Sequence, residues 1–141
     1  MNGYLLDTNI PSELTRPRPD ARVAAWLESA DDGQLYFSVI SLGEIVKGVS
    51  LLTSGHKRKE LEGWLETTLR PWFGDRVLSV DESVARRWGV LTAQSEREGR
   101  KLKVADGMIA ATALVHDLTI VTRNVKDFAG LGANVVNPWI L

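Results

Sequence analysis

Tyr4-Leu5-Leu6-Asp7-Thr8-Asn9 is the stretch that decides the fold, and it stands almost at the beginning of the chain. Apolar residues lead directly into an acid, a hydroxyl and an amide. A short apolar run that ends in a polar cluster is typical of a buried strand. Asp7 then lies where this strand ends, and ligands of open parallel sheets collect at the carboxyl ends of the strands. The alternative is that Asp7 only forms a turn with the backbone N–H groups that follow it.

Further apolar runs predict the other strands of a sheet of about five strands, over residues 4–6, 35–39, 76–80, 118–121 and 133–136. The stretches between them have the apolar spacing or the end signals of helices. We expect a short helix over 9–14, one capped by Asp20, one opened by Ser41, one that follows the basic run 56–59 and is stopped by Pro71, one capped by Asp81, and one over 107–116. Strands that alternate with helices predict an α/β fold with a parallel sheet covered on both faces.

The composition is that of a globular protein and excludes several kinds of site. Hydrophobic residues make up 44% of the chain and charged residues 25%, and no repeat is visible, so we expect one domain over residues 1–141. The 18 acidic and 17 basic residues argue against a surface coated in basic charge for non-specific nucleic-acid binding. The chain has no Cys, which excludes disulfides, zinc–thiolate sites and thiol catalysis.

The sequence predicts a cytoplasmic protein without a membrane segment. The N-terminus lacks the basic segment and apolar run of a signal peptide. No apolar stretch approaches the ~20 residues that a membrane-spanning helix needs. The absence of Cys is compatible with the cytosol.

Polar residues from distant parts of the chain are expected at one edge of the sheet. Helices in such folds run antiparallel to the strands that they cover, so a strand's end and the start of the next helix share an edge. Asp7 ends the first strand, Glu44 lies in the first turn of a helix, Asp106 precedes a helix, and Asn124 follows the fourth strand. We therefore expect these four side chains on one acidic rim.

Each acid of this rim also has a structural interpretation. Ser41-Leu42-Gly43-Glu44 matches a capping box, in which Glu44 would bond back to the backbone of Ser41. Asp106 could cap the helix that begins at Gly107. Asp81 reaches the same edge by the same topological argument, so topology alone does not exclude it.

The chemistry of an acidic rim favours a divalent cation. Neighbouring carboxylates repel one another, so their cluster needs a cation or bound protons. Oxygen ligands without Cys or His suit Mg²⁺ or Mn²⁺, and a water bound to such an ion can attack a phosphodiester. His56 and His116 are the only imidazoles and stand near no motif, so a histidine-based ribonuclease is not expected.

These residues together resemble PIN-domain proteins, specifically the VapC-type and FitB-type toxins of bacterial toxin–antitoxin pairs. The resemblance covers the whole chain and rests on motifs in the family's order: Leu5-Leu6-Asp7-Thr8-Asn9, Ser38-Val39-Ile40-Ser41 followed by Glu44, Ala105-Asp106-Gly107-Met108-Ile109-Ala110-Ala111-Thr112-Ala113, Thr122-Arg123-Asn124-Val125-Lys126-Asp127-Phe128, and Asn137-Pro138-Trp139.

The resemblance implies a three-layer α/β/α sandwich and a Mg²⁺- or Mn²⁺-dependent endoribonuclease that forms a homodimer and is neutralised by an antitoxin. It implies Asp7, Glu44 and Asp106 as metal ligands, with Asn124 as the fourth residue of the catalytic site. The family often has Asp at that fourth position, so this chain has one acid fewer there, and Asp127 follows one helical turn later. The number of bound metal ions stays open.

Two other functions were weighed against this one. A phosphatase of the haloacid-dehalogenase type also has a strand-end Asp near its N-terminus, but its motif needs an acid where this chain has Asn9. A catalytically inactive PIN-fold binding module would not need the retained acids. Cations in predicted loops could hold RNA phosphates or be ordinary surface charge: Arg16, Arg18, Lys101, Lys103 and Arg123.

Overall fold

The computed structural model describes residues 3–141, so the first two residues of the predicted 1–141 domain lie outside the described residues. Its centre is a five-stranded sheet in the order β3-β2-β1-β4-β5, in which each neighbouring pair of strands is parallel. The strands are β1 (Gly3–Leu6), β2 (Leu35–Ser38), β3 (Val77–Leu78), β4 (Leu118–Val121) and β5 (Val135–Val136). The predicted parallel α/β sheet is confirmed, and β1 lies in its middle.

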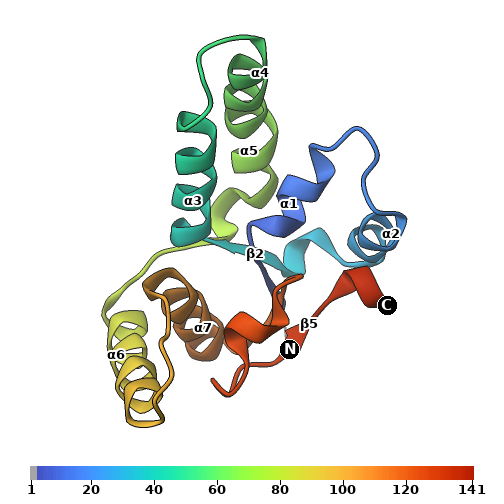
Figure 1. Ribbon diagram of the computed structural model, residues 1–141. Helices are drawn as coiled ribbons and strands as arrows, with labels where there is room; N and C mark the ends of the chain where they lie inside the picture. The colour runs from blue at the N-terminus through green and yellow to red at the C-terminus, as the bar shows by residue number, and fades with distance from the viewer. Residues whose placement is uncertain (1–2) are drawn as a thin grey trace.

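Helices lie on both faces of the sheet, as Figure 1 shows. The first face carries α1 (Asn9–Leu14), α2 (Ala21–Ser29), α3 (Val39–Ser50), α4 (His56–Trp64) and α5 (Arg70–Phe73). The second face carries α6 (Glu82–Arg97) and α7 (Val104–His116). Single turns complete the chain: η1 (Asp32–Gln34), the π-helical η2 (Leu65–Leu69), η3 (Gly74–Arg76), η4 (Val125–Phe128) and η5 (Pro138–Ile140).

Alternation along the central strands separates two hydrophobic cores. Leu6 and Val121 are fully buried in the core under α1 to α5, whereas their neighbours Leu5 and Ile120 are fully buried in the core under α6 and α7. Successive residues of a strand point to opposite faces, so both faces of β1 and β4 are apolar. Burying a side chain of this size contributes about 1.5–3 kcal/mol. The three-layer α/β/α sandwich is confirmed.

Helix starts follow the side chains that cap them. Asp20 accepts a hydrogen bond from the backbone N of Arg22 at 2.8 Å, and Asp81 accepts one from Val84 at 3.0 Å, so both predicted caps are confirmed. The prediction that Ser41 opens α3 is wrong. Ser38 caps this helix by accepting from the backbone N of Ile40 at 3.0 Å, because the extended backbone of β2 ends there.

The prediction that Pro71 stops its helix is also wrong. The backbone N of Arg70 bonds to the carbonyl of Leu65, five residues back, and this π-type shift makes Pro71 the start of a new helical turn, where a missing N–H is harmless. The helix continues to Phe73, which is fully buried and stacks on Phe37 with ring centroids 4.8 Å apart. Core packing at Phe73 therefore extends the helix past the proline.

The outer strands are shorter than predicted, with two residues each in β3 and β5. At β3 the predicted first residue, Arg76, instead belongs to η3 and uses its guanidinium to bond the carbonyls of Leu35 and Trp72 at 2.9 and 3.0 Å. Short edge strands limit pairing with other chains. Within residues 3–141, each helix is too short or too polar to cross a membrane.

Candidate active site

Asp7 is fixed at the carboxyl end of the central strand by its own strand and by β4. Leu6 pairs with Val121, which places Asp7 beside Thr122. The hydroxyl of Thr122 donates to one carboxylate oxygen of Asp7 at 2.8 Å, and the backbone N of Thr8 donates to the other at 2.9 Å. Only 7% of Asp7 is exposed. A local turn is therefore only part of its role, because a residue 115 positions away also holds the carboxylate.

A second set of hydrogen bonds holds Thr122 itself. The side-chain amide of Asn9 donates to the Thr122 hydroxyl at 3.2 Å, and the backbone N of Asn124 donates to the same oxygen at 3.0 Å. The side-chain oxygen Oδ1 of Asn9 accepts from the backbone N of Arg123 at 3.3 Å. The sequence had not marked Asn9 or Thr122 as site residues. The signal that could have found Thr122 is the pairing of two strands that both end in polar residues.

Glu44 and Asp106 come to the same rim from α3 and α7, on opposite faces of the sheet. Because α3 begins at Val39, Glu44 lies in the second turn, not the first, and the capping-box interpretation is wrong. Asp106 is the third residue of α7, whose N-cap position is Lys103, so the interpretation of Asp106 as a helix cap is wrong as well. Within residues 3–141, neither carboxylate forms an ion pair or a hydrogen bond with a side chain.

The acids interact electrostatically. Burial raises the pKa of Glu44, and the charges of Asp7 and Asp106 raise it further. Burial also raises the pKa of Asp106, together with the charges of Asp127 and Asp7. The pKa of Asp7 is raised by burial, while the hydrogen bonds from Thr122 and Thr8 lower it. The carboxylates of Asp7, Glu44 and Asp106, which come from the end of β1 and from α3 and α7, are thus coupled through their charges, which raise the pKa of Glu44 and of Asp106.

Asp127 and Asn124 differ in their effect on the rim, and the role of Asn124 in the site stays a prediction. Asp127, in η4, acts on both Asp7 and Asp106 through its charge, whereas the side chain of Asn124 is exposed and forms no cap hydrogen bond. Asp127 is therefore the nearby acid that the sequence left as an alternative to Asn124. Asp81 caps α6 and is not among the charges that act on Asp7, Glu44 or Asp106.

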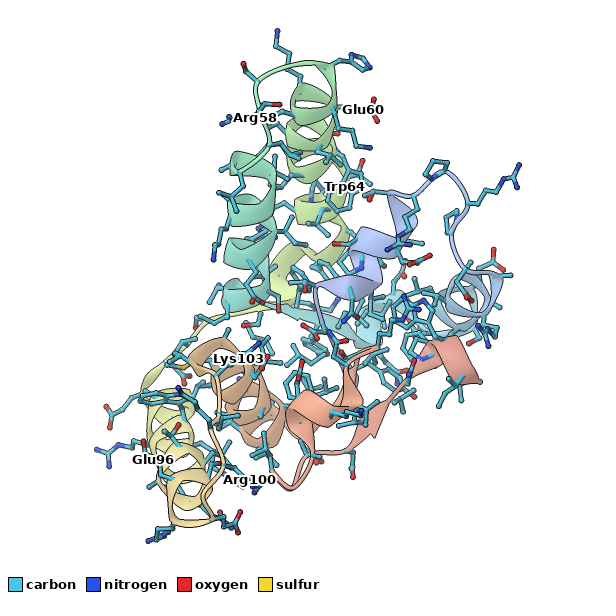
Figure 2. The ribbon with its side chains drawn as sticks, in the orientation of Figure 1. Arg58, Glu60, Trp64, Glu96, Arg100 and Lys103 are labelled. Atoms are coloured by element: carbon cyan, nitrogen blue, oxygen red, sulfur yellow. The ribbon has the colours of Figure 1, made fainter. Side chains whose placement is uncertain are left out.

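Hollows of opposite character border the acidic rim. The basic hollow, about 170 Å³ in volume, lies between the loop before α7 and η4; its lining includes Arg100, Lys101, Lys103, Asp106, Lys126 and Asp127. The apolar hollow, about 320 Å³ in volume, lies between α1, α3 and α4; its lining includes Thr8, Glu44, Ile45, Gly48, Val49 and Trp64. Figure 2 shows Lys103 and Arg100 beside α7 and α6, well apart from Trp64 on α4. The basic hollow contains Asp106 and Asp127 of the rim, and the apolar hollow contains Glu44.

The donor set of the rim fits a hard divalent cation. The charged side chains that shift the pKa values of Asp7, Glu44 and Asp106 are carboxylates, apart from flanking lysines. Among residues 3–141, no three His, Asp or Glu side chains are grouped so that they could jointly hold a metal ion. Mg²⁺ keeps several waters and is usually bound through one or two carboxylates. The rim therefore fits an ion that one or two acids bind directly and the others contact through water.

Comparisons with known proteins agree with this geometry. The PIN domain family model matches residues 4–133. Toxin FitB from Neisseria gonorrhoeae is 42% identical over 135 residues, which cover 96% of this chain and 97% of that protein. VapC ribonuclease Y4jK from Sinorhizobium fredii is 36% identical over 135 residues, covering 96% of each. The crystal structure of FitAcB from Neisseria gonorrhoeae superposes with a TM-score of 0.92 at 41% identity, covering 98% of this chain and 99% of that one. The chain belongs to the PIN-domain family.

Proposed function

We propose that the protein is a metal-dependent endoribonuclease and the toxin of a toxin–antitoxin pair. The observation that carries the proposal is the electrostatic coupling of Asp7, Glu44 and Asp106, which come from three separate elements to one rim. A catalytically inactive fold would gain nothing from this repulsion. The relatives named toxin and VapC ribonuclease, which align over nearly the whole chain, support the same conclusion.

Asp7, Glu44 and Asp106 would hold Mg²⁺ or Mn²⁺, one or two of them directly and the others through bound water. The ion would supply charge stabilisation at the scissile phosphate and an activated water. The chain's own contribution is to keep the acids placed and ionised. The Thr122 hydroxyl does so at Asp7, because a hydrogen bond to a carboxylate favours the charged form. Asn124 and Asp127 follow on the loop that Thr122 anchors, and we infer that this loop completes the site.

We infer two protein partners as well: an antitoxin that covers the rim, and a second copy of the chain. A side chain that reaches into a rim of carboxylates has to be cationic, and Arg suits carboxylates best. The basic hollow would repel such a cation. The antitoxin is therefore expected to approach across the apolar hollow, where Glu44 is bordered by Ile45 and Val49.

Cleavage of defined RNAs by the purified protein tests the enzymatic proposal. We expect cleavage with Mg²⁺ or Mn²⁺, none in EDTA, and none by Asp7→Asn, which keeps the size of the side chain. Phosphate release from small phosphate esters without RNA cleavage would instead favour the phosphatase alternative.

Expression in bacteria tests the toxin proposal separately. We expect growth arrest with the parent chain and normal growth with Asp7→Asn, and we expect the product of the neighbouring open reading frame to relieve the arrest. A parent chain that is harmless at an expression level matched to the variant would contradict the toxin assignment, whatever the nuclease assay shows.

A further inference from the structure

Arg100 joins the two walls of the basic hollow. Its guanidinium donates to the carbonyl of Ala129 at 2.8 Å and to that of Gly130 at 3.4 Å, and it pairs with Glu98. Gly130 has a φ of +77°, which favours glycine, and a Cβ there would force this guanidinium to shift. Arg100 thus ties the loop before α7 to the loop after η4. Its own charge is already used within the chain.

The remaining cations of the basic hollow are free to bind a ligand. Lys101, Lys103 and Lys126 are exposed and form no ion pair within residues 3–141. Two other cations of the predicted loops are engaged within the chain: Arg16 lies 3.5 Å from Glu13, and Arg123 lies over the ring of Trp139 at 5.3 Å. The three lysines of the hollow therefore outnumber its two carboxylates, Asp106 and Asp127, in a chain whose net charge is −1.

These lysines do not serve mainly to neutralise the rim. Among residues 3–141, none of the three lies within ion-pair distance of a carboxylate of the rim. Charge repulsion among three clustered lysines favours binding of an anion. The hollow also contains Asp106, so an anion bound there would lie next to the acidic rim without occupying it.

We propose that the basic hollow binds a phosphodiester of the RNA substrate through Lys101, Lys103 and Lys126, and that this phosphodiester neighbours, in the same strand, the one that is cut. Arg100 is a positioning residue that holds the hollow open. The proposal rests on the nuclease function proposed above and adds where the strand is anchored. Lysine binds phosphate as a point charge and reads no base, so this anchor contributes affinity without sequence preference.

Binding of RNA as a function of salt tests the proposal. We would compare the double variant Lys101→Ala/Lys126→Ala with Lys57→Ala/Lys59→Ala, which removes the same charge from exposed positions of α4 far from the hollow. The probe is a fluorescently labelled single-stranded RNA, bound in Mg²⁺ to proteins that also carry Asp7→Asn to prevent cleavage. Melting temperatures verify that each variant folds.

We expect the hollow variant, Lys101→Ala/Lys126→Ala, to bind RNA less tightly. The slope of its log binding constant against log salt concentration (the salt slope) should be shallower by about 0.7, the amount for one phosphate contact on a single strand. The α4 variant should keep the parent slope. In the cleaving background, the hollow variant should raise KM with kcat changed less than about twofold, because the acids are untouched. Lys101→Arg/Lys126→Arg should restore both slope and KM.

A hollow variant with the slope and KM of the α4 variant would overturn the phosphate anchor while the parent's cleavage still upholds the nuclease. A parent that neither binds nor cuts RNA would overturn both. A hollow variant that loses kcat instead of KM would also contradict the proposal, because the lysines would then act on the reaction and not on the strand.

Discussion

The two hollows beside the acidic rim are neighbours with opposite chemistry. The basic hollow combines Asp106 with lysines on irregular loops, whereas the apolar hollow combines Glu44 with Ile45 and Val49 on the regular helix α3. Charged groups hold a phosphate, and an apolar wall holds apolar side chains. We infer from this difference that the proposed RNA substrate and the proposed antitoxin would approach the same acidic rim from different sides.

The largest effect is expected from removing one acid in each hollow. Glu44→Gln and Asp106→Asn should each reduce kcat/KM for RNA on the order of 10³-fold. A bound metal ion stabilises the charge of the transition state by several kcal/mol, and ~1.4 kcal/mol corresponds to a tenfold change in rate. Single-turnover cleavage in Mg²⁺ measures this. If only one of the two variants lost activity, the rim would not be a single site bordered by both hollows.

Thr122→Val should destabilise the hydrogen bonds that hold Asp7 and the loop after β4 at the acidic rim. It removes the donor to Asp7 and the acceptor for the backbone N of Asn124, at a fully buried position. Unsatisfied buried groups cost about 1–3 kcal/mol, which urea denaturation measures. The pKa of Asp7 should rise further, so the acidic limb of the pH–rate profile should move to higher pH. Thr122→Ser, which keeps the hydroxyl, should leave that limb in place.

Gly48 allows the apolar hollow to be filled without disturbing the core. A Cβ at this α3 position would meet no atom within 4 Å. Gly48→Ala should therefore stabilise the chain by about 0.5–1 kcal/mol. Gly48→Phe should weaken antitoxin binding at least about tenfold, or 1.4 kcal/mol, and leave the salt slope of RNA binding unchanged. Calorimetric titration with the antitoxin is the measurement, and equal affinity for both variants would place the antitoxin elsewhere.

The smallest effect concerns the stability of the metal-free protein. The folded chain raises the pKa of Asp106 above its ordinary value of 3.8, so the folded state holds this proton to higher pH than the unfolded chain does. The free energy of unfolding therefore falls as the pH rises from 3.8 through the raised pKa, and stays lower above it. Asp106→Asn removes this loss.

In EDTA, Asp106→Asn should consequently be more stable than the parent at neutral pH, by less than about 1 kcal/mol because the carboxylate is partly exposed. The advantage should vanish well below pH 3.8, where Asp106 of the parent is protonated in both the folded and the unfolded state. Added Mg²⁺ should stabilise the parent more than the variant. Thermal melting across pH checks this, and a variant less stable than the parent in EDTA would show that Asp106 does not experience net repulsion.

The sequence predicted those parts of the fold that depend on local pattern. The buried strands around Leu5 and Ile120 and the caps Asp20 and Asp81 all follow from apolar runs and capping residues. The helix past Pro71 could not be predicted in this way, because packing of Phe73 on Phe37 overrides a local stop signal. The shortness of β3 depends likewise on a tertiary contact, the bond of Arg76 to the carbonyl of Leu35.

The acidic rim shows the same division. Topology alone predicted that Asp7, Glu44 and Asp106 share an edge, and their electrostatic coupling agrees with that prediction. Their role as metal ligands stays a prediction. Local pattern does not mark Thr122, because its bond to Asp7 depends on the register between β1 and β4; only the pairing of these two strands brings it beside Asp7. The basic hollow depends on a contact between Arg100 and Ala129, 29 residues apart, which leaves no local signal.

The central claim is that this rim cuts RNA with an activated water and not with the RNA's own 2′-hydroxyl. Mapping the ends of the products formed from a defined RNA tests it most directly. The account predicts 5′-phosphate and 3′-hydroxyl ends, formed only with Mg²⁺ or Mn²⁺ and absent with Asp7→Asn. Products that end in 2′,3′-cyclic phosphate, formed in EDTA by the parent and by Asp7→Asn alike, would contradict it.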